Sequence, residues 1–290
     1  MNDAFLSIVI SGLVLGSLYS LMSTGLSLTW STLRIFNFAH GAFMTLGAYL
    51  AWTFLVFLHL PVIIGVFLAL LCLSVSSILF QYVFISPFLK RQQGDLLVMV
   101  TTLSAMTIIT TLIQATWGPH YKQLPTLIEF ELKIGATTIG ANQLMAIVLA
   151  PVMSILVSYL LAHTRLGLAV RAVEQNRNAA RLVGIEIQGV QSITIISSTI
   201  LAGIAGILLG GITFVSPVMG DDPLLKAFVV VIFGGLAKLS GSIYGAYVFG
   251  FMESLSTYAF GLFWTPIVIF TAMIFIMLFR PEGLMRGRTS

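Results

Sequence analysis

The chain consists of long runs of apolar residues separated by short polar segments. Most of these runs are near the ~20 residues that an α-helix needs to cross the hydrocarbon core of a bilayer. The pattern therefore predicts an all-α polytopic membrane protein, a helical bundle of eight to nine transmembrane spans. The runs cover roughly 5–30, 38–58, 62–86, 96–117, 143–163, 191–213, 225–237, 242–257 and 262–279.

One of these runs is shorter than a full crossing. The stretch 225–237 ends near the pair Gly234-Gly235, which favours half of a broken or re-entrant helix. Such a helix is tolerated only where protein or an aqueous cavity covers its free backbone groups. Counted as a crossing, this run gives nine spans. Omitted, or fused with its neighbour, it leaves eight.

Positive charge favours nine spans with the N-terminus outside and the C-terminus in the cytoplasm. In that arrangement inner segments carry eleven of the fourteen lysines and arginines, as the positive-inside rule requires. Eight spans would place the basic tail 280–288 outside. The inner residues are Arg34, Lys90, Arg91, Arg165, Arg171, Arg177, Arg181, Lys238, Arg280, Arg286 and Arg288, and the outer ones are Lys122, Lys133 and Lys226.

Composition excludes a soluble protein. Only 8% of the 290 residues are charged, against about a quarter in soluble domains. No room remains for a separate soluble domain, so we expect a single transmembrane domain over 1–290. The single cysteine, Cys72, excludes disulfides and cysteine metal sites within the chain. The basic balance follows membrane topology and does not indicate nucleic-acid binding.

Two loops stand out between the runs. The outer loop 118–142 alternates apolar and polar residues over 128–134, which predicts a small β-hairpin. The inner loop 164–190 carries four arginines, and its polar side chains fall within an arc of roughly 120° on a helical wheel. We therefore expect a short amphipathic helix on the cytoplasmic surface. The residues of that arc are Arg171, Glu174, Arg177 and Arg181.

Small residues spaced four apart predict close contacts between helices. Three G-x-x-x-G pairs lie in or beside the apolar runs, and such pairs let two helix backbones approach closely. The pairs are Gly12/Gly16, Gly206/Gly210 and Gly241/Gly245.

Motifs for catalysis or nucleotide binding are missing from the sequence. It contains neither G-x-x-x-x-G-K-[ST] nor G-x-G-x-x-G, and no H-E-x-x-H metal motif. The histidines His40, His59, His120 and His163 are scattered. We therefore expect no enzymatic activity, no catalytic residue, no metal site and no cofactor in this chain.

Glu253 is the only acidic residue inside a predicted span. Ion-coupled transporters generally carry ionisable groups near the bilayer midplane. Because Glu253 lies near the outer end of its run, we expect its carboxylate to snorkel to the interface. The alternative is a self-sufficient secondary transporter that uses Glu253 as its proton carrier. The scarcity of intramembrane charge favours an energy source outside the chain, coupled through the inner loop.

Four segments resemble the branched-chain amino-acid ABC permeases, specifically the H-type of their two paired membrane subunits. One is Leu33-Arg34-Ile35-Phe36-Asn37-Phe38-Ala39-His40-Gly41, which continues to the stretch 46–50. The others cover 167–173, 179–185 and 228–236. Two positions depart from the family pattern. Ala42 stands where an acidic residue is frequent, and Asn176-Arg177 stands where Asn-Pro is frequent.

This resemblance implies an inner-membrane permease subunit of a bacterial ATP-driven importer for branched-chain or related apolar amino acids. It would form the translocation pathway with a second homologous permease. A periplasmic substrate-binding protein would deliver the solute, and two cytoplasmic ATPase subunits would hold the ATP and Mg. The same machinery carrying urea, an amide or an aromatic acid is the nearest alternative.

The resemblance also assigns roles to residues. The inner loop matches the coupling segment that docks on an ATPase, and Asn176 or Asn178 is a candidate N-cap for its second short helix. Anchoring of the arginines to anionic lipid is the alternative. Other residues are candidates either for the translocation pathway or for helix packing. The coupling candidates are Arg171, Glu174, Asn176, Arg177, Ala180, Arg181, Gly184 and Ile185, and the pathway candidates are Asn37, His40, Gly41, Gly234, Gly235, Gly241 and Glu253.

Overall fold

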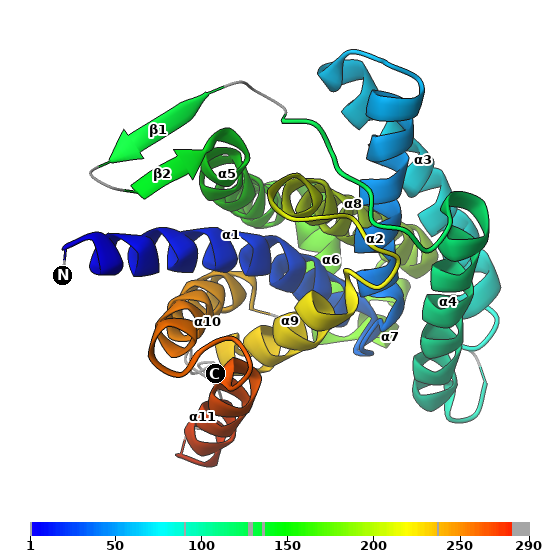
Figure 1. The fold of residues 1–290 in the computed structure, drawn as a ribbon. Helices are drawn as coiled ribbons and strands as arrows, with labels where there is room; N and C mark the ends of the chain where they lie inside the picture. Colours follow the sequence, from blue (N-terminus) through cyan, green and yellow to red (C-terminus); the bar gives the residue numbers. More distant parts are fainter. Residues whose placement is uncertain (1, 90, 127–129, 135–136, 237, 280–290) are drawn as a thin grey trace.

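The computed structural model describes residues 2–89, 91–126, 130–134, 137–236 and 238–279, and these are mostly helical. Figure 1 shows the helices gathered into one bundle. Each of the nine apolar runs forms a helix. The elements are α1 (Asn2–Leu33), α2 (Ala39–Trp52) with the π-helical turn η1 (Thr53–Phe57), α3 (Val62–Phe80) with the π-helical turn η2 (Gln81–Ile85), α4 (Gly94–Trp117), β1 (Glu131–Ile134), β2 (Thr137–Gly140), α5 (Ala141–His163), α6 (Arg165–Gln175), α7 (Arg177–Leu182), α8 (Ile187–Ile212), α9 (Asp221–Gly234), α10 (Leu239–Phe260) and α11 (Thr265–Phe279).

Six of the described helices are long and apolar enough to cross a membrane. This confirms a polytopic helical membrane protein. A shorter apolar helix covers Thr265–Phe275. The six candidate spans are Ala4–Leu33, Ala39–Phe57, Val62–Ile85, Gly94–Trp117, Ala141–His163 and Ile187–Ile212.

The core of the bundle lies along α1, α2 and α8. In the candidate spans formed by these helices, 56–67% of an 18-residue apolar stretch is buried inside the protein. The corresponding share is 17–22% in the spans formed by α3, α4 and α5. The exposed side chains of the outer helices are themselves large and apolar, such as Ile63 and Phe67 on α3. Contiguous apolar surfaces of this extent are rare on soluble monomers and suit contact with lipid or a partner helix.

Glycines allow the tightest helix contacts, as the G-x-x-x-G pairs predict. A Cβ placed on Gly12 or Gly16 of α1 would overlap Phe251 and Tyr247 of α10, respectively. On α8, a Cβ on Gly206 would overlap the backbone of Met44 in α2. These contacts hold α1 against α10 and α8 against α2 at backbone distance.

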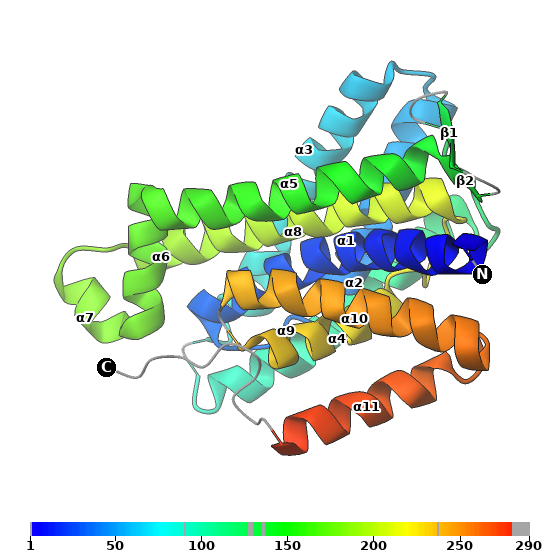
Figure 2. The ribbon, with the colours of Figure 1, turned by 90° about the vertical axis from the view of Figure 1, so that its left-hand side faces the viewer.

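The loops gather at two opposite ends of the bundle. At one end the backbone of Lys122 pairs with that of Val215, which joins the 118–142 loop to the α8–α9 connection. At the other end a guanidinium nitrogen of Arg177 donates to the carbonyl oxygen of Thr32 at 2.6 Å. Figure 2 shows the hairpin beside the start of α1 and the helices α6 and α7 at the far end. The described loops are thus divided between the two ends of the bundle, while Lys90 and the tail 280–290 lie outside the described residues.

The predicted hairpin is present in the 118–142 loop. Strands β1 and β2 pair antiparallel, with Glu131 opposite Gly140 and Ile134 opposite Thr137. Residues 128 and 129 of the alternating stretch lie outside the described residues. Figure 1 shows the hairpin beside the first turns of α5.

The short run 225–237 forms α9, with 14 residues from Asp221 to Gly234. At 1.5 Å per residue it is about 21 Å long, less than the ~30 Å hydrocarbon core. It ends at Gly235, whose φ of +97° is a conformation that suits glycine. The next helix, α10, begins at Leu239 and runs back alongside α9.

Candidate functional site

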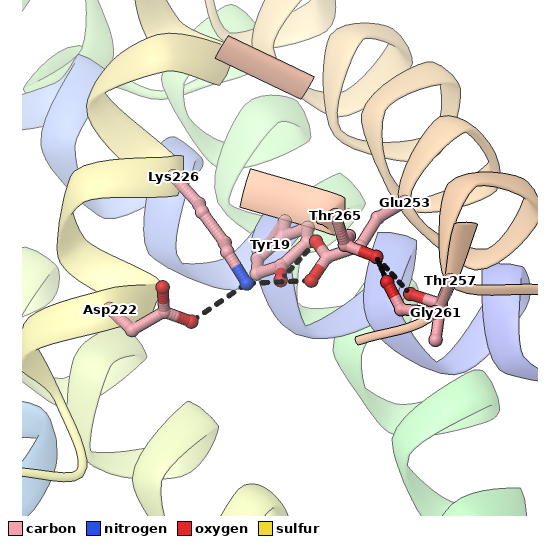
Figure 3. A network of polar contacts seen from close by, with 7 residues as sticks. All are labelled: Tyr19, Asp222, Lys226, Glu253, Thr257, Gly261 and Thr265. Atoms are coloured by element: carbon pink, nitrogen blue, oxygen red, sulfur yellow. Dashed lines mark hydrogen bonds and ion pairs between the residues drawn. The ribbon is translucent and has the colours of Figure 1, made fainter. Parts of the chain in front are cut away.

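A buried ion pair joins α9 to α10. The ammonium of Lys226 lies 2.6 Å from a carboxylate oxygen of Glu253, and both side chains are less than 10% exposed. The other carboxylate oxygen of Glu253 accepts a 2.6 Å hydrogen bond from the hydroxyl of Tyr19 on α1. Figure 3 shows the three side chains converging from their three helices.

This pair corrects two expectations from the sequence. Glu253 does not snorkel to the interface, because it is buried and bound on both oxygens. Lys226 does not lie in an outer loop, because it occupies the second turn of α9. A carboxylate inside a bundle is costly unless it is paired and hydrogen-bonded, and Lys226 and Tyr19 supply both conditions.

Asp222 completes the charged cluster, by which we mean Tyr19, Asp222, Lys226 and Glu253. Its carboxylate lies 2.7 Å from the ammonium of Lys226, one helical turn away, and its side chain is 67% exposed. The cluster contains two acidic groups and one basic group, a formal charge of −1. Beside it, hydroxyl contacts between Thr257 and Thr265 connect α10 to α11 (Figure 3).

A cavity of about 240 Å³ adjoins this cluster. Three charged side chains lie on its wall, and most of its other lining residues are apolar and come from α1, α2, α8 and the segment after α8. Sequence reasoning singled out Glu253 but missed Tyr19, Asp222 and Lys226. The signal for the last two was the Asp-x-x-x-Lys spacing, which places both side chains on one face of a helix.

The segment between α1 and α2 is irregular backbone held by polar side chains. Arg34 has a φ of +56°, and the side-chain oxygen of Asn37 accepts a 3.1 Å hydrogen bond from the backbone N–H of Ala39. His40 is buried, and its Nδ1 lies 3.3 Å from the hydroxyl of Ser198 on α8. Asn37 and His40 therefore brace the entry to α2.

The candidate glycines lie at close helix contacts. A Cβ on Gly41 would stand 2.6 Å from the carbonyl oxygen of Gly220, where α2 passes the start of α9. Gly234 and Gly241 face each other across the α9–α10 turn, and a Cβ on either would overlap the other's backbone. Gly235 forms the turn itself. These contacts give the glycines a packing role, and any part in the translocation pathway stays a proposal.

The inner loop contains two short helices, α6 and α7, as the family resemblance implies, whereas the helical wheel placed the polar residues on one continuous helix. Asn176 separates α6 from α7, with extended backbone dihedrals and a side-chain oxygen that accepts from the N–H groups of Asn178 and Ala179. The predicted N-cap is therefore Asn176. Because the chain changes direction here, the single helical wheel was wrong for the residues on either side of it.

The arginines of the loop do not share one exposed face. Arg171 donates to the carbonyl oxygen of Leu161, and Arg177 donates to that of Thr32. Arg181 is exposed. Burial lowers the pKa of the Arg177 guanidinium. Burial also raises the pKa of the Glu174 carboxyl, although the positive charges of Arg34 and Arg171 act in the opposite direction. Of these three arginines, Arg171 and Arg177 thus brace the loop on the bundle.

The loop is packed at its base and exposed at its tip. Val170, Val173 and Ala180 are buried against Leu28 of α1 and Val190 of α8. After α7 the chain turns through Gly184, which has a φ of +85° and precedes half-buried Ile185.

Two apolar residues at this turn point into solvent. Leu182 is 88% exposed and Val183 is 76% exposed. Large apolar side chains at such a tip suit a partner surface. Both lie within the stretch 179–185 that resembles the family, although neither was among the coupling residues singled out from the sequence.

Comparison with known proteins identifies the family. Residues 8–278 match the family model described as the permease component of branched-chain amino acid transport systems. The chain belongs to this family. A second cavity, of about 420 Å³, lies at the loop 164–190. Its lining includes Arg177, Arg181, Gln188 and Gln191.

Full-length relatives carry the same description. BraD, a high-affinity branched-chain amino acid permease of Pseudomonas aeruginosa, is 24% identical over 97% of this chain and 95% of its own. The probable LivH permease of Methanocaldococcus jannaschii is 29% identical over 98% and 94%. LivH of Escherichia coli K12 is 24% identical over 97% and 95%. Among solved structures, PsaBC from Streptococcus pneumoniae in complex with Fab shares the fold, with a TM-score of 0.50, 12% identity and coverage of 95% of this chain and 90% of that one.

Proposed function

We propose that this chain is the inner-membrane permease subunit of an ATP-driven importer for branched-chain or related apolar amino acids. The observation that carries the proposal is the family match over residues 8–278, together with relatives of the same length and function. In this proposal the pathway forms with a second homologous permease, and a periplasmic binding protein delivers the solute. ATP and Mg belong to two separate cytoplasmic ATPase subunits, and this chain is not an enzyme.

We further propose nine crossings, with the short α9 counted as one and the N-terminus outside. Successive connections alternate between the two ends of the bundle, which supports this count. The end that holds α6 and α7 would be cytoplasmic, because the positive-inside rule places the basic loops there. The single domain 1–290 would then present its outer loop 118–142 to the binding protein and its coupling loop 164–190 to an ATPase.

The coupling assignment rests on the shape of the loop. Its base is fixed to α1 and α8 by apolar packing and by the Arg177–Thr32 contact, so movement of the tip would be transmitted to these helices. Leu182 and Val183, with Arg181, Gly184 and Ile185, are the proposed docking residues. Anionic lipid remains a second partner for Arg181.

A secondary transporter driven by Glu253 is less well supported. Both carboxylate oxygens of Glu253 are engaged, one by Lys226 and one by Tyr19. A proton carrier must exchange its proton with both sides in turn, and in this structure both oxygens of the buried carboxylate are already bound by side chains of the protein.

The proposal is tested by recovering the permease from its own membranes and identifying what accompanies it by mass spectrometry. We expect an ATPase and a second permease in stoichiometric amounts. A mock preparation from untagged cells is the control. Recovery of this chain alone, or as a homo-oligomer without an ATPase, would contradict the proposal.

A further inference from the structure

The cavity beside the charged cluster has two chemically different walls. One wall holds the side chains of Asp222, Lys226 and Glu253. The remaining lining is mostly aliphatic or thioether and comes chiefly from α1, α2, α8 and the segment that follows α8. Its main apolar members are Leu15, Leu18, Met22, Met44, Leu209 and Met219.

The charged wall matches both ends of a zwitterion. Lys226 has three N–H donors, of which one points to Asp222 and one to Glu253, so a third is available to an incoming carboxylate. The exposed carboxylate of Asp222 is positioned to accept from an ammonium group. An ammonium also offsets the formal −1 charge of the cluster, an interaction that strengthens away from bulk water.

We propose that this cavity is a transit site for an amino-acid zwitterion with an apolar side chain. The ammonium of the amino acid contacts Asp222, its carboxylate contacts Lys226, and its side chain lies against Met22, Met44 and Leu209. This inference rests on the proposed function and narrows its substrate class.

The same wall discriminates against the alternative solutes. Urea and simple amides would displace water from the charged residues of the wall. Because they carry no charge, they cannot replace that water with ionic contacts. An aromatic acid brings a carboxylate without an ammonium, so it adds negative charge to a cluster that is already formally negative. The site therefore favours an amino acid over either.

Cysteine protection tests occupancy of the cavity directly. In a Cys72→Ser background, Thr213→Cys places one thiol on the cavity wall of the assembled permease complex, in detergent and without the binding protein. We expect L-leucine to slow its reaction with a methanethiosulfonate reagent, and urea or 4-methylpentanoate to have no such effect. Met219→Cys provides a second reporter on the same lining.

Asp222→Asn and Asp221→Asn form a matched pair, because the two residues are adjacent and only Asp222 lines the cavity. We expect Asp222→Asn to raise the leucine concentration for half-protection about tenfold, through loss of one charge-assisted hydrogen bond. Asp221→Asn should leave it unchanged. The paired variant Lys226→Gln/Glu253→Gln removes the buried charges together and should assemble normally without protection by leucine.

Several outcomes would overturn the inference: no protection by leucine in the parent protein, equal protection by 4-methylpentanoate or urea, or unchanged protection in Asp222→Asn or in the paired variant. ATP-driven leucine uptake by the complete importer is measured in parallel. Uptake without protection would refute the site and leave the proposed function standing. Protection without uptake would refute the proposed function and leave the site standing.

Discussion

Replacing Leu182 and Val183 together with aspartate is expected to release the ATPase subunits and abolish ATP-driven transport. Both side chains are exposed at the tip of the coupling loop and contribute little to the fold of the isolated chain. In the assembled importer they would be buried against the ATPase, where two new carboxylates would be costly. We expect recovery of ATPase per permease to fall at least about tenfold, which corresponds to roughly 1.4 kcal/mol of binding free energy.

The matched control is Leu262→Asp/Phe263→Asp. These residues are 79% and 82% exposed in the α10–α11 connection, at the opposite end of the bundle from α6 and α7. Their replacement should leave ATPase recovery unchanged. If the Leu182/Val183 variant still retains its ATPase and transports normally, the tip of the loop is not the docking element.

Glu253→Ala is expected to cause the largest loss of stability among single substitutions in the charged cluster. It removes the partner of a buried ammonium and leaves the hydroxyl of Tyr19 without its acceptor. Breaking a buried ion pair typically costs about 3–5 kcal/mol. Because Lys226 keeps its contact with Asp222, we expect about 3 kcal/mol, the lower end of that range. The unfolding midpoint of the purified permease in detergent measures the effect.

The paired variant Lys226→Met/Glu253→Leu separates charge from packing. It replaces both members of the ion pair with apolar residues of similar size, and such replacements are often neutral. We therefore expect it to recover most of the lost stability. Glu131→Ala, at an exposed position on β1, should have no measurable effect. If the paired variant were less stable than Glu253→Ala, the loss of stability in Glu253→Ala could not be attributed to the unpaired ammonium of Lys226. The attraction within the ion pair would then itself stabilise the fold.

Most helices could be predicted from the sequence because lipid imposes a simple rule. A chain that crosses a membrane must satisfy its backbone hydrogen bonds internally and expose apolar side chains to the lipid. Each span is therefore a long apolar run. The short run at 225–237 identified α9 and its end at Gly235 for the same reason. The hairpin followed from the alternation of residues in the 118–142 loop, which is also a local property.

What the sequence did not reveal depends on contacts between distant residues. Lys226 and Glu253 are 27 positions apart, and they meet only because the chain reverses at Gly235. A hydropathy pattern places a charged residue near the end of an apolar run at the membrane interface, because it contains no information about an ion-pair partner on another helix. The break at Asn176 followed from the family resemblance, which implied a second short helix with an asparagine N-cap, whereas the helical wheel assumed one continuous helix through that residue.

The measurement that tests the account most directly is uptake of labelled L-leucine into proteoliposomes that contain the complete importer. The binding protein is supplied outside and ATP inside. We predict leucine accumulation that requires hydrolysable ATP and persists when ionophores dissipate the proton and sodium gradients. Accumulation by this permease alone, driven by an imposed gradient and abolished by ionophores, would contradict the account.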